Sequence, residues 1–211
     1  MQNDVSLRLA KRIWEVVEKE FESGELFEKV SPITKELLRF WFCEPFISQR
    51  QFNFHKGQKQ SILNIIYLHE VLKINNVLEI YEQVAPDLLL ESDLFGAKET
   101  RNSLKESRYD LPKYLVKMAT GTGKTWVMHA LLIWQILNAK NEEEKSGRFT
   151  KNFLIVAPGL IVYDRLLDAY KGRLQENGNG RDFSTNDFVR NKDLFVPENY
   201  REEVFSFIQN N

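Results

Sequence analysis

The chain has 211 residues, of which 43% are apolar, and its 30 acidic and 29 basic side chains leave a formal charge of -1. This length and composition suffice for one substantial hydrophobic core. The near balance of charge argues against a basic arm that binds nucleic acid through bulk charge, although local amides and a few cations can still bind phosphates.

Helices are predicted in the first part of the chain. Apolar residues recur at three- and four-residue steps from Leu9 to Phe21, and Gly24 closes this run. Ser31-Pro32 has the form of an N-cap followed by proline in the first helical position. Further helices are predicted from about Gln58 to Leu72 and from Val77 to Val84, and ordinary packing explains all of these apolar stripes.

Strands and helices are predicted to alternate in the second part. Tyr114–Met118 and Phe153–Ala157 are compact apolar strand candidates, and helices are expected at Trp126–Leu137 and about Ile161–Leu174. The alternation predicts an α/β fold, with parallel β-α-β units and a sheet covered on both faces. A last helix is expected after Pro197.

A phosphate-binding loop is predicted between the first strand candidate and the helix after it. Its sequence is Ala119-Thr120-Gly121-Thr122-Gly123-Lys124-Thr125. Gly121 and Gly123 fill positions where the backbone must approach a phosphate closely. The helix N-terminus that follows adds partial positive charge. We therefore expect ATP and Mg²⁺ as cofactors of this loop.

Each residue of the loop has an expected role. Lys124 reaches the β- and γ-phosphates, and the Thr125 hydroxyl holds Mg²⁺, so these two form the catalytic pair. Met118 departs from the usual pattern at the outermost small position, where phosphate contact constrains the residue least. The nucleotide is expected to contact Thr120, Gly121, Thr122, Gly123, Lys124 and Thr125.

With this loop in place, the chain resembles a superfamily 2 DEAD/DEAH-type helicase of the restriction branch. Residues 118–125 resemble motif I and residues 153–159 resemble motif Ia. The string Arg39 to Pro45, followed by residues 64–70, is similar to the DNA-translocating R subunit of type III restriction enzymes. The resemblance implies a RecA-like P-loop NTPase fold, with an N-terminal helical region (1–50) and a partial first motor domain (51–211) that carries an insertion at about 85–110.

Gln58 resembles the adenine-reading glutamine that precedes motif I in this superfamily. Its amide presents a donor and an acceptor side by side, which matches adenine N6 and N7 and refuses guanine. The alternative is a solvated residue in the first turn of a helix. Phe54 and Trp41 are candidates for stacking on the base, with core packing as the alternative for both.

Pro158 and Gly159 are candidates for contact with nucleic acid. They end the second strand candidate, at the edge of the sheet where ligands of such folds gather. The alternative is a simple strand-to-helix turn. The resemblance implies double-stranded DNA as the substrate and allows a methyltransferase or modification subunit as a partner.

Several motor elements are missing from these residues. The sequence contains no Asp-Glu pair of the motif II type, and neither an arginine finger nor a nuclease cluster is recognisable. We therefore expect a fragment of a helicase or translocase, from a restriction or phage-defence system, that does not hydrolyse ATP at a useful rate alone. A P-loop kinase or GTPase, or an inactive interaction module, stays open as an alternative.

The expected location is the cytoplasm. Cys43 is the single cysteine and cannot form an internal disulfide, which suits a reducing compartment. No stretch approaches the about 18 apolar residues of a membrane span, and the N-terminus lacks a signal-peptide pattern. No membrane partner is therefore expected.

Overall fold

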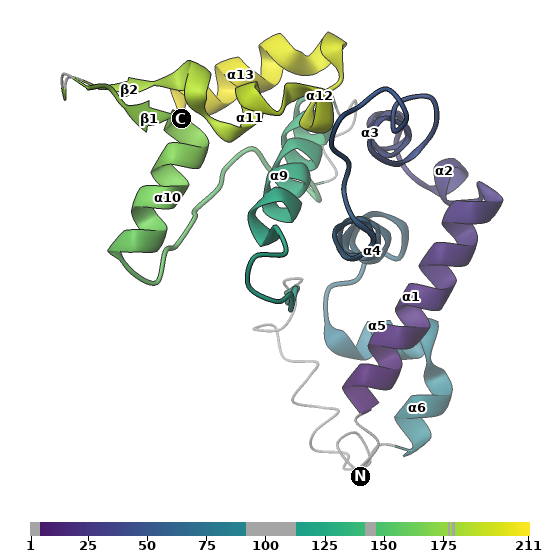
Figure 1. The fold of residues 1–211 in the computed structure, drawn as a ribbon. Helices are drawn as coiled ribbons and strands as arrows, with labels where there is room; N and C mark the ends of the chain where they lie inside the picture. The colour runs from purple at the N-terminus through teal and green to yellow at the C-terminus, as the bar shows by residue number, and fades with distance from the viewer. Residues whose placement is uncertain (1–4, 92–112, 142–146, 177, 179) are drawn as a thin grey trace. The chain divides into compact units, whose positions relative to one another are not determined.

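The computed structural model describes residues 5–91, 113–141, 147–176, 178 and 180–211 (Figure 1). It consists of two compact units, each built from two stretches of the chain. Unit 1 contains Met1–Val30 and Lys56–Thr122, and unit 2 contains Ser31–His55 and Gly123–Asn211. The predicted insertion lies outside the described residues from position 92 onward.

The regular elements that the structure describes in unit 1 are all helical. The first helix, α1, ends where Gly24 adopts a φ of 84°, as the sequence predicts. Helix α4 packs on α1 and buries Ile62, Leu63 and Ile66. A π-helical turn, η1, continues α4, so the predicted helix is present as two consecutive elements. The elements are α1 (Val5–Ser23), α2 (Leu26–Lys29), α4 (Lys56–Ile66), η1 (Tyr67–Val71), α5 (Val77–Val84) and α6 (Pro86–Glu91).

Unit 2 is built around a long apolar helix, α9, which contacts α3, α12 and α13. The predicted cap of α3 is confirmed, because the Ser31 hydroxyl accepts the Thr34 N–H at 3.0 Å and Pro32 is the first helical residue. The elements are α3 (Pro32–Phe42), α9 (Lys124–Asn141), α10 (Leu160–Lys171), β1 (Arg173–Leu174), β2 (Arg181–Asp182), η3 (Phe183–Thr185), α11 (Asp187–Arg190), α12 (Lys192–Phe195), η4 (Glu198–Tyr200) and α13 (Arg201–Asn210).

The predicted α/β fold with a parallel sheet is wrong for this structure. The described residues form a mostly helical chain, and their strands are limited to β1 and β2. These two strands pair antiparallel, with Arg173 opposite Asp182 and Leu174 opposite Arg181. The hairpin loop includes Gly178 at a φ of 70°.

Both strand candidates, residues 114–118 and 153–157, have no regular secondary structure. A strand of a parallel sheet is buried on both faces and paired through its backbone. Here Leu115 is 92% exposed and Leu154 is 89% exposed. The apolar composition of these segments favours an extended conformation. A β-strand also needs a neighbouring strand with which its backbone can form hydrogen bonds. The described residues do not provide one.

Candidate nucleotide-binding loop

The predicted phosphate loop has the backbone conformation that its glycines permit. Gly121 has a φ of 80° and Gly123 a φ of 74°, both in the left-handed region that favours glycine. A β-carbon on Gly121 would meet no atom within 4 Å. Glycine is therefore required at Gly121 by the backbone angle and not by crowding.

A tight turn precedes the helix. The backbone N–H and the hydroxyl of Thr122 both donate to the Ala119 carbonyl oxygen, at 3.4 and 2.7 Å. The boundary between the two units falls directly after Thr122. This turn fixes the loop locally at the point where the chain passes from unit 1 to unit 2.

Helix α9 begins at Lys124, inside the loop motif. The Gly123 carbonyl accepts the N–H groups of Trp126 and Val127 at 3.0 and 3.4 Å, which closes the first turn. Among the described residues, the amide of Thr125 makes no hydrogen bond and neither does its hydroxyl. The Thr125 amide is chemically suited to bind a phosphate, because helix N-terminal amides bind anions. The Thr125 hydroxyl is suited to bind Mg²⁺, because a hydroxyl oxygen can ligate this ion.

Buried polar contacts hold α9 against the start of α3. The Trp134 indole N–H and the Asn138 amide both donate to the Thr34 hydroxyl, at 2.9 and 3.0 Å. The Ser31 hydroxyl donates to the side-chain amide oxygen of Asn138 at 2.5 Å. All of these residues belong to unit 2. The helix that carries Lys124 is thus fixed in rotation and register within its own unit.

An aromatic cluster packs on the first turns of α9. Trp126, next to the loop, lies edge-on to Phe195 with ring centroids 5.7 Å apart. His129 lies 4.4 Å from Phe188 and 5.1 Å from Tyr170, again between centroids. Burial lowers the pKa of His129 to about 3, and neither ring nitrogen has a hydrogen-bond partner among the described residues. His129 is therefore an uncharged member of the cluster near neutral pH.

Gln58 is the third residue of α4, in unit 1. Its side chain is only 3% exposed, so the alternative of a solvated first-turn residue is wrong. Lys124 belongs to unit 2, and the adenine-reading role of Gln58 stays a prediction. Trp41 and Phe54 are buried in unit 2, where the Trp41 indole donates to the Phe195 carbonyl oxygen at 2.9 Å. Core packing thus describes both aromatic residues.

Pro158 and Gly159 are exposed and precede α10. Gly159 is the N-cap of α10 and has φ -179° and ψ 167°, an extended conformation that any residue adopts. No side chain caps this helix start. The preceding segment is not a strand, so the predicted strand end is absent, while the exposed helix start remains. Contact of this turn with nucleic acid stays a prediction.

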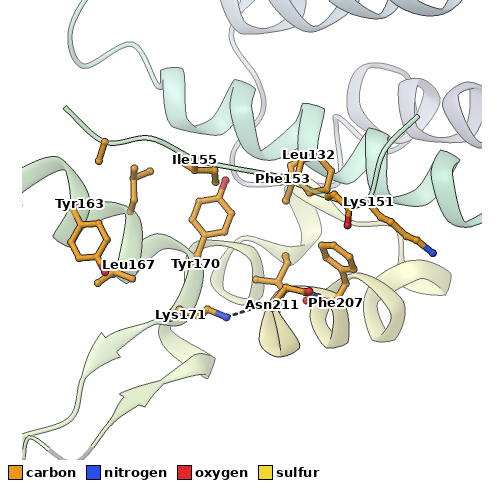
Figure 2. A pocket seen from close by; sticks show the side chains of 14 residues that line it. Leu132, Lys151, Phe153, Ile155, Tyr163, Leu167, Tyr170, Lys171, Phe207 and Asn211 are labelled. Atoms are coloured by element: carbon orange, nitrogen blue, oxygen red, sulfur yellow. Dashed lines mark hydrogen bonds between the residues drawn. The ribbon is translucent and has the colours of Figure 1, made fainter. Parts of the chain in front are cut away.

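A cavity of about 440 Å³ lies in unit 2 between α10, α13 and the segment before Pro158 (Figure 2). Its walls are mainly apolar and include Phe153, Ile155, Tyr170 and Phe207. The Lys171 ammonium group at its edge donates to the Ile208 carbonyl oxygen at 3.1 Å, at the end of α13. Sequence patterns do not predict this cavity, because it joins segments that are distant along the chain.

The hydrogen-bonded network of Thr34, Trp134 and Asn138 is also absent from the sequence-based prediction. The capping motif at Ser31 is visible in the sequence, but Ser31 and Asn138 are 107 positions apart. A polar asparagine within a strongly apolar helix was the one available signal, since a buried amide requires partners. None of the described helices is long and apolar enough to cross a bilayer.

Comparison with known proteins identifies the family. The sequence model of the family described as "Type III restriction enzyme, res subunit" matches residues 51–210, which is most of the chain. Neither the curated proteins nor the solved structures give a significant match. The match includes the loop from Ala119 to Thr125 and the segment up to Gly159. The chain therefore belongs to the type III restriction enzyme res subunit family, and is a helicase-related part of a restriction enzyme.

Proposed function

We propose that this chain binds ATP with Mg²⁺ as part of a DNA helicase or translocase motor of a restriction or phage-defence system. The observation that supports this most directly is the loop itself. Two glycines with positive φ lead into a helix that begins at Lys124, within a chain of a restriction-enzyme family. Backbone amides and a helix N-terminus favour an anionic ligand at such a loop.

The roles within the loop follow from charge and reach. Lys124 is exposed at the first position of α9, so its ammonium group is accessible to the β- and γ-phosphates. Thr125 would hold Mg²⁺ through its hydroxyl, and Thr120 to Gly123 would surround the phosphates with backbone amides. When bound, ATP supplies the phosphoanhydride bond whose cleavage drives such motors.

Gln58 is proposed to select adenine. Its amide has the required donor and acceptor, and the burial of its side chain favours a fixed orientation. Selection then appears as a difference in affinity between ADP and GDP. Gln58→Ala is expected to reduce that difference, with circular dichroism as the check that α4 is intact.

DNA is the proposed substrate, because the chain belongs to a restriction-enzyme family. Pro158 and Gly159 are exposed beside the uncapped N-terminus of α10, which favours a phosphate contact there. A modification subunit is a further proposed partner. Since the sequence contains no Asp-Glu pair, we expect slow or no turnover of bound ATP by these residues alone.

Calorimetric titration with ADP and Mg²⁺ tests the proposal. Charge-assisted hydrogen bonds contribute roughly 1.5–3 kcal/mol each, so Lys124→Ala should weaken binding at least about tenfold. Lys117→Ala is the matched control, because Lys117 is exposed just before the loop. Equal affinity in the wild type and in Lys124→Ala would remove Lys124 from the site, and undetectable binding by the wild type would refute the proposal. Preference for GDP would favour the GTPase alternative.

A further inference from the structure

His69 lies in the π-helical turn η1, which continues the helix that carries Gln58. Its side chain is only 9% exposed. The ring nitrogen Nδ1 is within hydrogen-bond distance of the Tyr114 hydroxyl oxygen, at 3.3 Å, and the two rings meet edge-on with centroids 6.1 Å apart. Single π-helical turns are found frequently at functional sites. This turn holds a buried polar side chain against a residue 45 positions away along the chain.

Tyr114 begins the segment that leads into the phosphate loop. Tyr114, Val116 and Met118 are half-buried and the residues between them are exposed, an alternation that is typical of an extended chain. Ala119 then accepts the N–H and the hydroxyl of Thr122 in the turn of the loop. Because five residues span at most about 18 Å, a fixed Tyr114 restricts where this turn can lie.

The contact between His69 and Tyr114 lies within unit 1, which also contains Gln58 and the first part of the loop, Ala119–Thr122. Helix α4 and η1 run without a break from Lys56 to Val71. One helical element therefore carries the proposed adenine-selecting amide and contacts the approach to the phosphate loop. A ligand that spans both ends of a site binds more tightly when the groups that receive it are already correctly separated.

We propose that His69 is a positioning residue for nucleotide binding. Through Tyr114 it holds Ala119–Thr122 of the phosphate loop at a fixed position relative to α4, which carries Gln58. This inference rests on the proposed function, because it concerns the same site. His69 acts through Tyr114 and not by contact with the nucleotide, so its loss lowers affinity while the phosphate-binding groups remain in the chain.

Calorimetric titration of the full chain with ADP and Mg²⁺ measures the effect on affinity. His69→Phe keeps a ring in the buried position and removes its nitrogens, and Tyr114→Phe removes only the hydroxyl. Each variant should weaken ADP binding roughly two- to tenfold, the range expected for the loss of one hydrogen bond. The double variant should bind no more weakly than either single variant, because both substitutions break the same contact.

Tyr67→Phe is the matched control. Tyr67 lies in the same turn, and its hydroxyl donates to Glu20 Oε1 on α1 at 3.0 Å. This variant should lower the thermal stability by an amount comparable to that of His69→Phe and leave ADP affinity unchanged. His69→Asn should recover part of the affinity, because its amide can hydrogen-bond at about the position of Nδ1. Equal losses of affinity in Tyr67→Phe and His69→Phe would show a general effect of stability and overturn the proposal.

Hydrogen exchange without nucleotide tests the contact separately from binding. The amides of residues 115–122 should exchange roughly two- to tenfold faster in His69→Phe and in Tyr114→Phe, and at the wild-type rate in Tyr67→Phe. Unchanged exchange in the first two variants, or faster exchange with unchanged ADP affinity, would overturn the positioning role of His69 alone. A wild type that binds no ADP would instead refute the proposed function, and the positioning role with it.

Discussion

Helix α9 and the segment Phe153–Ala157 are the most apolar stretches of unit 2, yet their surroundings differ completely. The helix buries Ile133, Trp134 and Leu137, and its Trp134 indole and Asn138 amide donate to the Thr34 hydroxyl. The segment is largely exposed, and its backbone makes no hydrogen bond to any residue that the structure describes. Apolar sequence thus predicts that a segment needs a partner, but it does not say whether the partner lies within the chain.

The largest expected effect on the free energy of unfolding comes from comparing a leucine-to-alanine substitution in each of the two regions. Leu137→Ala removes a fully buried side chain and should lower the free energy of unfolding by about 2–5 kcal/mol. Leu154→Ala removes an exposed side chain and should change it by less than about 0.5 kcal/mol. Urea unfolding of dilute protein measures both. Similar losses in the two variants would mean that the segment is packed in solution.

The next largest effect is a pH dependence of the free energy of unfolding, which originates in the aromatic cluster on α9. Burial lowers the folded-state pKa of His129 to about 3, whereas an unfolded histidine titrates near about 6.5. Between these values the unfolded chain binds more protons, so this contribution to stability is complete above about pH 6.5 and is lost on acidification toward pH 3. One pKa unit corresponds to about 1.36 kcal/mol.

His129→Phe should remove this dependence while keeping a ring in the cluster. From pH 6.5 to 4.5 the wild type should lose about 2 kcal/mol more than the variant does. Urea unfolding at a series of pH values gives the comparison. Parallel pH profiles for the two proteins would show that His129 is accessible to water or hydrogen-bonded in solution.

The smallest expected effect on stability distinguishes two glycines, Gly121 before α9 and Gly159 after Phe153–Ala157. Gly121→Ala introduces a β-carbon at a φ of 80° and should cost about 1–2 kcal/mol. Gly159→Ala, at φ -179° with open space around it, should be within about 0.5 kcal/mol of the wild type. Thermal unfolding of both variants provides the test. A loss at Gly159 equal to that at Gly121 would indicate a conformational demand at the start of α10.

Helices are well predicted from this sequence because their signals are local. The N-cap at Ser31, the stop at Gly24 and the span of α5 all depend on neighbouring residues. The phosphate loop is predictable for the same reason, since its glycines and Lys124 are consecutive. Strands depend on distant partners, which is why Tyr114–Met118 and Phe153–Ala157 are predicted as strands but have no regular secondary structure in the described residues.

Side-chain environments are not predictable from the sequence for a related reason. His129 has no distinctive neighbours in sequence, and its lowered pKa arises from burial in a cluster completed by Phe188 and Phe195. The sequence predicts Gln58 near a helix start, which the structure confirms, but the alternative of a solvated side chain is wrong because Gln58 is buried. The burial of a side chain depends on the whole folded unit. The periodicity of a single sequence indicates which face of an element is buried, but not how deeply an individual residue is buried.

Hydrogen exchange of backbone amides, with and without ADP and Mg²⁺, tests nucleotide binding by the loop most directly. The amides of Thr120 to Thr125 should become protected, because they are expected to bind the phosphates. Those of Phe153–Ala157 should exchange as before, and Lys124→Ala should show no protection in the loop. Protection confined to other elements, or no change at saturating ADP, would contradict the assignment of the phosphate loop.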